Sequence, residues 1–175
     1  MGSGKGHARS LSAAFALACV AWPALGRDAA PSAPSIRVLV DGRAAITLDR
    51  AALAAMPRTT VNTPAIHHEP AAQWQGVALE ELLQRAGAPG GEHLRGHAMT
   101  TIVRVIAADH YQVVFSLGEL DPSLGHEPVL LADTQDGHAL TTSGPFRLIV
   151  PGDRRPARWV RSVTTVEAGS DASVH

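Results

Sequence analysis

The sequence predicts an α+β fold, a single mixed-sheet domain with short helices. Segments in which apolar and polar residues alternate, such as residues 99–107, indicate strands. The pair Asp41-Gly42 between two apolar segments is a strong signal for a two-residue hairpin turn. Leu79, Leu82 and Leu83 have the i, i+3, i+4 spacing of an apolar helix face. With 175 residues and 45% hydrophobic content, the chain can bury one core.

Local signals place the individual elements in order. Asp49 and Ser116 carry side-chain oxygens that can cap a helix N-terminus. Pro57, Gly87 and Pro122 are expected to end helices. Strands are expected at residues 36–40, 45–48, 59–62, 99–107, 111–115, 129–132, 144–150 and 158–166, and helices at residues 50–56, 78–86 and 117–120.

The N-terminal segment has the pattern of a secretory signal peptide. Lys5 and Arg9 precede an apolar, alanine-rich run over residues 11–22. Small residues then suit a signal peptidase, so we expect residues 1–26 to be removed. The following residues, 27–35, are rich in Ala, Pro and Ser and are expected to form a flexible lead.

Cleavage there would leave a mature chain without cysteine or lysine, because Cys19 and Lys5 are the only ones in the sequence. Disulfides, thiolate ligands and Schiff bases are then excluded, and such an exported protein is expected in a bacterial periplasm. Lipidation at Cys19 is the alternative, although Ala16 stands where a larger aliphatic residue is usual. No apolar run is long enough for a permanent membrane span.

Arginines are concentrated near the C-terminal end of the predicted sheet. Residues 146–150 alternate as a half-buried strand would, and only one acid, Asp153, accompanies the arginines. Guanidinium groups near a turn between strands can hold an oxyanion, because each offers planar paired donors. The alternative is a solvated basic edge that prevents unwanted strand pairing. The arginines are Arg147, Arg154, Arg155, Arg158 and Arg161.

His67-His68-Glu69 is the only cluster of ligand-capable side chains, in a loop predicted over residues 64–73. The histidines could bind a metal only if the loop made them converge; otherwise they are solvated. Glu80 and Glu81 are also expected to be solvated, on their helix. Nucleotide-binding glycine loops and nucleophile elbows are absent from the sequence. The formal charge of −1 and the few, dispersed aromatic residues argue against a nucleic-acid partner.

A series of motifs resembles, in order and spacing, the molybdopterin-binding domain of the sulfite oxidase type. Trp-Gln-Gly-Val-Ala-Leu-Glu-Glu-Leu-Leu at 74–83 is similar to the family's Trp-x-Gly segment. Ala-Asp-His-Tyr at 108–111 is similar to its Asp-Gly-Tyr turn, with His110 replacing the glycine. Further matches are Gly-Pro-Phe-Arg-Leu-Ile-Val-Pro-Gly at 144–152, Ala-Arg-Trp-Val-Arg at 157–161, and residues 116–120, 129–132 and 136–140.

This resemblance implies a mixed α+β fold with a cavity for the pyranopterin phosphate. Arg147, Arg158 and Arg161 match segments at that cavity, so they are the candidate residues for binding a molybdopterin cofactor. Catalytic members ligate molybdenum with a cysteine about ten residues before the Trp-x-Gly motif, whereas residues 61–65 contain none. Thiolate suits such a metal best, so standard oxo-transfer is not expected, and no catalytic residue or metal ligand is assigned.

Three hypotheses follow for the exported domain, which the resemblance places at residues 36–167, before a disordered tail at 168–175. The first is a periplasmic oxidoreductase-family protein that binds molybdopterin or another anion through its arginines, without family-type catalysis. The second is a cofactor-free binding or accessory module for a protein partner, such as a periplasmic redox protein. The third is an enzyme with an unusual metal ligand, such as His67 or His68.

Overall fold

The computed structural model describes residues 1–3 and 33–170. Nearly all of the expected signal peptide and most of the expected lead therefore lie outside the described residues. Within the described part of the chain, no helix combines the length and apolar character needed to cross a bilayer.

The first sheet is mixed and consists of β1 (Ser35–Val40), β2 (Arg43–Asp49), β5 (Ile102–Ala107), β6 (Gln112–Ser116) and β10 (Val163–Gly169). Its order is β2-β1-β10-β5-β6, so the strand at the centre is the one nearest the C-terminus. β10 pairs parallel with β1 and antiparallel with β5. Hairpins join β1 to β2 and β5 to β6, which confirms both predicted turns.

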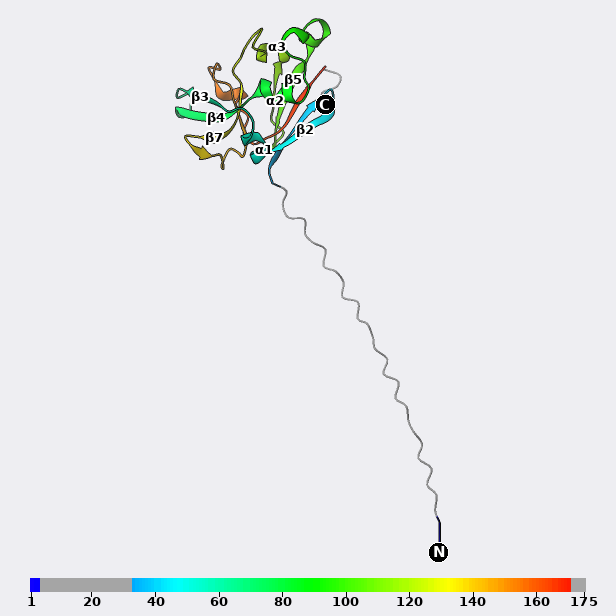
Figure 1. The fold of residues 1–175 in the computed structure, drawn as a ribbon. Coiled ribbons are helices and arrows are strands. Elements are labelled where there is room, and N and C mark those ends of the chain that lie inside the picture. The colour runs from blue at the N-terminus through cyan, green and yellow to red at the C-terminus, as the bar shows by residue number, and fades with distance from the viewer. Residues whose placement is uncertain (4–32, 171–175) are drawn as a thin grey trace. The chain divides into compact units, whose positions relative to one another are not determined.

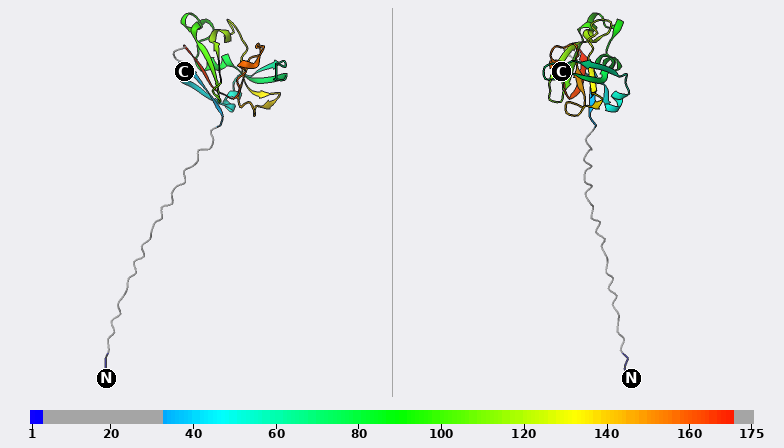
Figure 2. Two further views of the ribbon diagram at one scale, coloured as in Figure 1. Left: turned by 180° about the vertical axis from the view of Figure 1, so that it is seen from behind. Right: turned by 90° about the vertical axis from the view of Figure 1, so that its left-hand side faces the viewer.

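The second sheet is antiparallel and consists of β3 (Thr59–Thr63), β4 (Ala72–Ala78), β7 (Leu130–Gln135), β8 (His138–Ala139) and β9 (Arg147–Ile149). Its order is β3-β4-β7, after which both β8 and β9 pair with β7. Figure 1 shows β3, β4 and β7 on one side of the domain and β1, β2 and β5 on the other. The view from behind in Figure 2 shows the same separation.

Short helices connect the strands: α1 (Arg50–Ala54), α2 (Leu79–Arg85), α3 (Leu117–Leu120) and the 3-10 turns η1 (Gly91–His93), η2 (Gly96–Thr100) and η3 (Pro156–Arg158). The Asp49 carboxylate accepts a hydrogen bond from the Ala52 amide and caps α1, as predicted. Ser116 and Glu119 form a reciprocal capping box at the start of α3. The observed architecture confirms the predicted α+β class.

Both sheets and α2 contribute to one hydrophobic core. Trp74 of β4, Phe115 of β6 and Phe146, next to β9, are among its largest fully buried side chains. Leu79, Leu82 and Leu83 of α2 are also fully buried, as their spacing predicted. The core therefore joins β4 and β9, the strands that carry the site described below, to the first sheet.

Gly76 permits a close approach between β4 and β7. A Cβ atom at this position would overlap the Leu131 carbonyl oxygen and lie 2.6 Å from Ala132 Cα. The pairing register also shifts between Gln75 and Gly76. Because both obstacles are backbone atoms, no side-chain movement could make room for a larger residue. This contact explains the glycine of the Trp-x-Gly motif.

Several predicted boundaries are wrong. β5 begins at Ile102 rather than residue 99, because η2 occupies the preceding residues. The strand predicted at residues 129–132 instead runs to Gln135. The helix predicted to reach residue 56 ends at Ala54. The amphipathic patterns identified each element, but they did not fix where its hydrogen bonding starts or stops.

The C-terminal segment departs further from the prediction. η3 and an irregular stretch replace the first half of the strand expected at residues 158–166, and β10 begins only at Val163. Ala168 and Gly169, expected in a disordered tail, are buried residues of β10. Residues 171–175 of that expected tail lie outside the described residues.

The half-buried alternation predicted for residues 146–150 is also wrong, since all five are buried. β9 pairs with β7, and its Leu148 amide donates to the Val160 carbonyl of the segment after η3. Arg147 is therefore a buried residue, 4% exposed, and not part of a solvated basic edge.

We expect Gly76→Ala to destabilise the domain by about 3 kcal/mol, because the added methyl group must push β4 away from β7. Gly118→Ala in α3 is the matched control. Its Cβ would meet the flexible end of Met99 at 3.2 Å, so its effect should stay within about 1 kcal/mol. Urea unfolding of the two variants measures the difference; equal stabilities would contradict the proposed backbone contact.

Candidate functional site

A tight turn between β3 and β4 positions Glu69. Ile66 and Glu69 exchange two backbone hydrogen bonds of 2.9 Å, and His67 adopts a left-handed conformation at φ +54°. His67 and His68 form the exposed tip of this turn. The sequence grouped the two histidines with Glu69 as one ligand cluster, but the turn gives the carboxylate a different environment.

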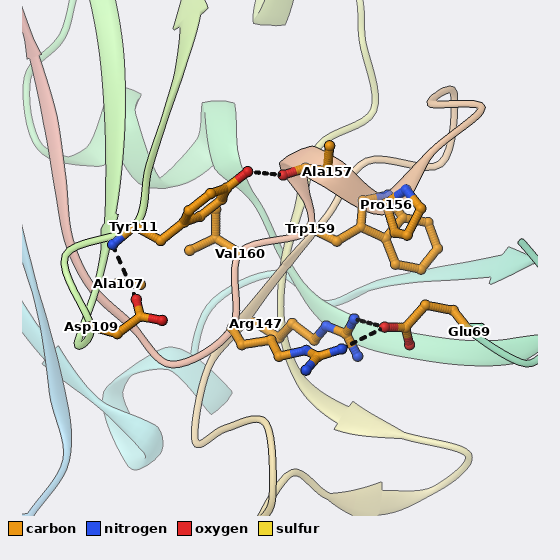
Figure 3. Close-up of a pocket in the computed structure, with 10 residues that line it drawn as sticks. Glu69, Ala107, Asp109, Tyr111, Arg147, Pro156, Ala157, Trp159 and Val160 are labelled. Carbon is orange, nitrogen blue, oxygen red and sulfur yellow. Dashed lines mark hydrogen bonds and ion pairs between the residues drawn. The ribbon is translucent and has the colours of Figure 1, made fainter. Parts of the chain in front are cut away.

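Glu69 forms ion pairs with two of the predicted arginines. Its Oε1 atom accepts hydrogen bonds from Arg147 Nη2 at 2.7 Å and from Arg161 Nη2 at 3.0 Å (Figure 3). The hydrogen bond from Arg147 is the main cause of a lowered pKa for Glu69, and it outweighs the opposing effect of burial. Glu69 is therefore a carboxylate at neutral pH, and the three side chains carry one net positive charge.

The Arg147 guanidinium lies close to two indole rings. Its carbon is 5.1 Å from the ring centroid of Trp74 and 5.9 Å from that of Trp159. The two rings pack edge to face, 6.1 Å apart. Cation–π contacts and the Glu69 pair thus stabilise a charge that burial alone would destabilise. Arg147 Nε is buried and has no hydrogen-bond partner among the described residues.

A cavity of about 270 Å³ opens beside this arrangement. Figure 3 shows Tyr111 and Asp109 on the side of the β5–β6 turn, with Glu69 and Trp159 on the other side. The Tyr111 hydroxyl donates to the Ala157 carbonyl at 2.7 Å and so links that turn to η3. The lining residues include Glu69, Asp109, Tyr111, Arg147, Trp159 and Arg161.

Arg158 does not line this cavity. Its guanidinium pairs with both carboxylate oxygens of Asp153, at 3.0 and 2.6 Å, and with Glu119 at 3.1 Å. Its carbon also lies 4.7 Å from the centroid of the Phe115 ring. The hydrogen bonds that Arg158 donates to Asp153 are the main cause of its raised pKa. The structure therefore brings together two of the three candidate arginines, and Arg158 connects α3 to the turn after β9.

The sequence profile of the oxidoreductase molybdopterin binding domain matches residues 35–174, most of the chain. The chain belongs to this family. Among proteins with curated descriptions, none matches.

A solved structure shares the fold. The sulfane dehydrogenase SoxCD from Paracoccus pantotrophus matches with a TM-score of 0.60 and 18% sequence identity. The match covers 79% of this chain and 38% of that chain. This chain thus corresponds to well under half of the larger protein, and the likeness at this identity concerns the fold alone.

Among the described residues, no cysteine precedes the Trp-x-Gly motif, where the family resemblance implies a molybdenum ligand. None of their His, Cys, Asp and Glu side chains form a group of three or more that could hold a metal ion. In the segment that precedes the Trp-x-Gly motif, Thr63 accepts a hydrogen bond from Trp74 Nε1, and Asn62 accepts one from Gln73. Cys19, the only thiol in the sequence, lies outside the described residues.

The anion-binding part of a pterin cofactor fits better than the metal does. Arg147 and Arg161 are suitable donors for a phosphate. However, about 270 Å³ is slightly below the usual range of roughly 300–1,000 Å³ for pockets that enclose a drug-sized ligand. Glu69 also already occupies one donor of each arginine. The cavity as it stands suits a small anion or one end of a larger ligand.

Several residues of the site were not predicted as such. The sequence analysis predicts Glu69 in a loop cluster and Tyr111 at the start of a strand, and it predicts no site role for Trp74 or Trp159. A buried guanidinium group requires a carboxylate partner and favourable contacts with its apolar surroundings. The position of Arg147 within an apolar strand was therefore the one signal in the sequence for this site. Nothing in the sequence indicated which acid would pair with it.

A second cavity, also of about 270 Å³, lies between β3, β4 and the segment before β7. Glu80 lines it, and its buried Oε2 has no hydrogen-bond partner among the described residues. The prediction of a solvated Glu80 is therefore wrong. Burial, followed by repulsion from Asp121, raises the pKa of Glu80, although His126 opposes the shift.

A carboxyl group whose pKa is raised by folding destabilises the native state when it is ionised. We expect Glu80→Gln to stabilise the domain by about 0.5 kcal/mol at neutral pH. The gain should disappear as the pH falls below the unfolded-state pKa of about 4.3, where Glu80 is protonated in both states. Thermal unfolding across this pH range tests it, with the exposed Glu92→Gln as control; a gain independent of pH would contradict the assignment.

Proposed function

We propose that this protein is an exported member of its family that binds an anionic ligand through Arg147 and Arg161, without thiolate-ligated molybdenum catalysis. The observation that carries the proposal is the buried Arg147 guanidinium beside an open cavity. Proteins rarely bury arginine without a pairing or binding role, because removing its charge from water is costly. The family profile supports a molybdopterin-type ligand as one candidate, and a smaller oxyanion as another.

The two arginines have different parts in this proposal. Arg147 is fixed by Trp74, Trp159 and Glu69, so it offers a preorganised charge at the base of the site. Arg161, whose side chain is 65% exposed, can adjust its position to an incoming ligand. Tyr111 lines the cavity on the β5–β6 side, where its hydroxyl donates to the Ala157 carbonyl. If a molybdopterin-type ligand binds, these residues would hold its phosphate.

An accessory module without a cofactor is the second proposal. Tyr111 and Val114 are about half exposed, and β6 forms an end of the first sheet. An unpaired strand edge with apolar side chains is a common place for another protein to bind. In this case the partner would be another exported protein, such as a redox protein.

We expect inorganic phosphate to bind the full mature chain and Arg161→Gln to weaken this binding about tenfold, since one charge-assisted hydrogen bond is lost. Isothermal titration calorimetry measures both affinities. Arg155→Gln, which removes an exposed arginine outside the cavity, is the control. Arg161 rather than Arg147 is replaced because its side chain is exposed, so the variant should remain folded. Equal affinities for the wild type and Arg161→Gln would remove this site from the function.

We also expect protein purified from its own periplasm to lack stoichiometric molybdenum. The reason is that residues 61–65 contain no cysteine, where the family resemblance implies the molybdenum ligand. Mass spectrometry of the metal and fluorescence of the oxidised pterin measure the two components separately. Pterin without molybdenum would support binding of the organic part, and absence of both would favour a smaller anion or a protein partner. Near-stoichiometric molybdenum would contradict the proposal of a non-catalytic member.

A further inference from the structure

We infer that Glu69 acts as an internal competitor at the anion site, so that a ligand must displace its carboxylate from Arg147 and Arg161. This inference rests on the proposed function and adds a residue that determines which anions can bind. The reason is that a single oxygen, Glu69 Oε1, accepts from both guanidinium groups. That oxygen occupies the bridging position that an oxyanion shared by the two arginines would need.

The surroundings of Glu69 allow such an exchange. The residue ends a short turn between β3 and β4, outside both strands, and its side chain is 15% exposed. The backbone bonds between Ile66 and Glu69 involve no side-chain atoms. The carboxylate can therefore rotate away from the arginines into water while the turn and both strands remain intact. Arg147, held by the two indole rings, stays in place for the ligand.

Competition of this kind selects among ligands by charge. The Glu69 carboxylate is covalently attached, so its effective concentration at the arginines is on the order of millimolar or higher. A free monocarboxylate offers the same chemical group and gains little by replacing it. A doubly charged tetrahedral oxyanion offers more charge and more acceptor oxygens, and it can contact both guanidinium groups through separate atoms. The site should therefore prefer phosphate-like dianions to carboxylates.

Asp109 provides a control that distinguishes competition by Glu69 from general electrostatic repulsion of the ligand. It lines the same cavity and carries the same charge, but its Oδ1 accepts from the Tyr111 amide rather than from an arginine. Asp109→Asn removes one negative charge near the ligand while leaving the arginine contacts of Glu69 unchanged. A competitor role predicts a large effect for Glu69 and a small one for Asp109, whereas simple charge repulsion predicts similar effects for both.

The test is a titration of the wild-type chain, Glu69→Gln and Asp109→Asn with inorganic phosphate and with acetate at mildly alkaline pH. We expect Glu69→Gln to bind phosphate about tenfold more tightly than the wild type, and Asp109→Asn to change the affinity by about twofold. Acetate should bind measurably to Glu69→Gln only. Equal gains for both variants, or unchanged phosphate affinity in Glu69→Gln, would overturn the competitor role but leave an anion site. Absence of phosphate binding in all three proteins would instead refute the site itself.

A measurement on the wild type covers the case in which Glu69→Gln fails to fold. The ¹³C resonance of the Glu69 carboxylate reports on its hydrogen-bond donors, so it should shift toward the value of a solvated glutamate as phosphate saturates the site. The Asp109 carboxylate resonance serves as the internal control. If phosphate saturates the protein and the Glu69 resonance does not move, the ligand binds beside Glu69 without displacing it, and the inference is wrong.

Discussion

Burial of the Arg147 guanidinium is the constraint on which the arrangement of the site depends. An isolated charge in the protein interior is strongly unfavourable, so the fold must supply compensation from several directions. Trp74 comes from β4, Trp159 from the segment after η3, and Glu69 from the turn before β4. Compensation of the Arg147 charge therefore positions three separate segments around β9. The cavity is a result of this arrangement, because its base and one wall are made of the same residues.

This dependence gives Glu69 two roles that oppose each other. As a structural partner it neutralises a buried charge, and as a neighbour of the cavity it occupies the donors that a ligand would use. These opposing roles of Glu69 also matter for comparing the chain with its family. The chain has the fold of its family, and under the proposed function Arg147 and Arg161 would hold an anionic ligand in place of Glu69.

Local sequence signals predicted which helices and strands form, but they did not predict the burial or the partners of key side chains. The Asp41-Gly42 turn, the Ser116 cap and the α2 leucines act within a few residues, so the sequence was sufficient to identify them. Burial of Arg147 and the pairing of Arg158 with Glu119 depend on contacts between segments far apart in the chain. Alternating polarity cannot reveal that a second segment covers the outer face of a short strand. The family resemblance did not distinguish Arg147 and Arg161, which line the cavity, from Arg158, which pairs with Asp153.

The strand order of the first sheet has a consequence for how the chain folds. β1–β2 and β5–β6 are local hairpins, whereas β10 must insert between them and pair with both. These non-local pairings raise the contact order, and they can form only after nearly the whole domain has been synthesised. Until then β1 and β5 each present an unpaired edge, which is a hazard for aggregation. Protection by a chaperone during synthesis would therefore matter more for this chain than for a domain whose last strand lies at an edge.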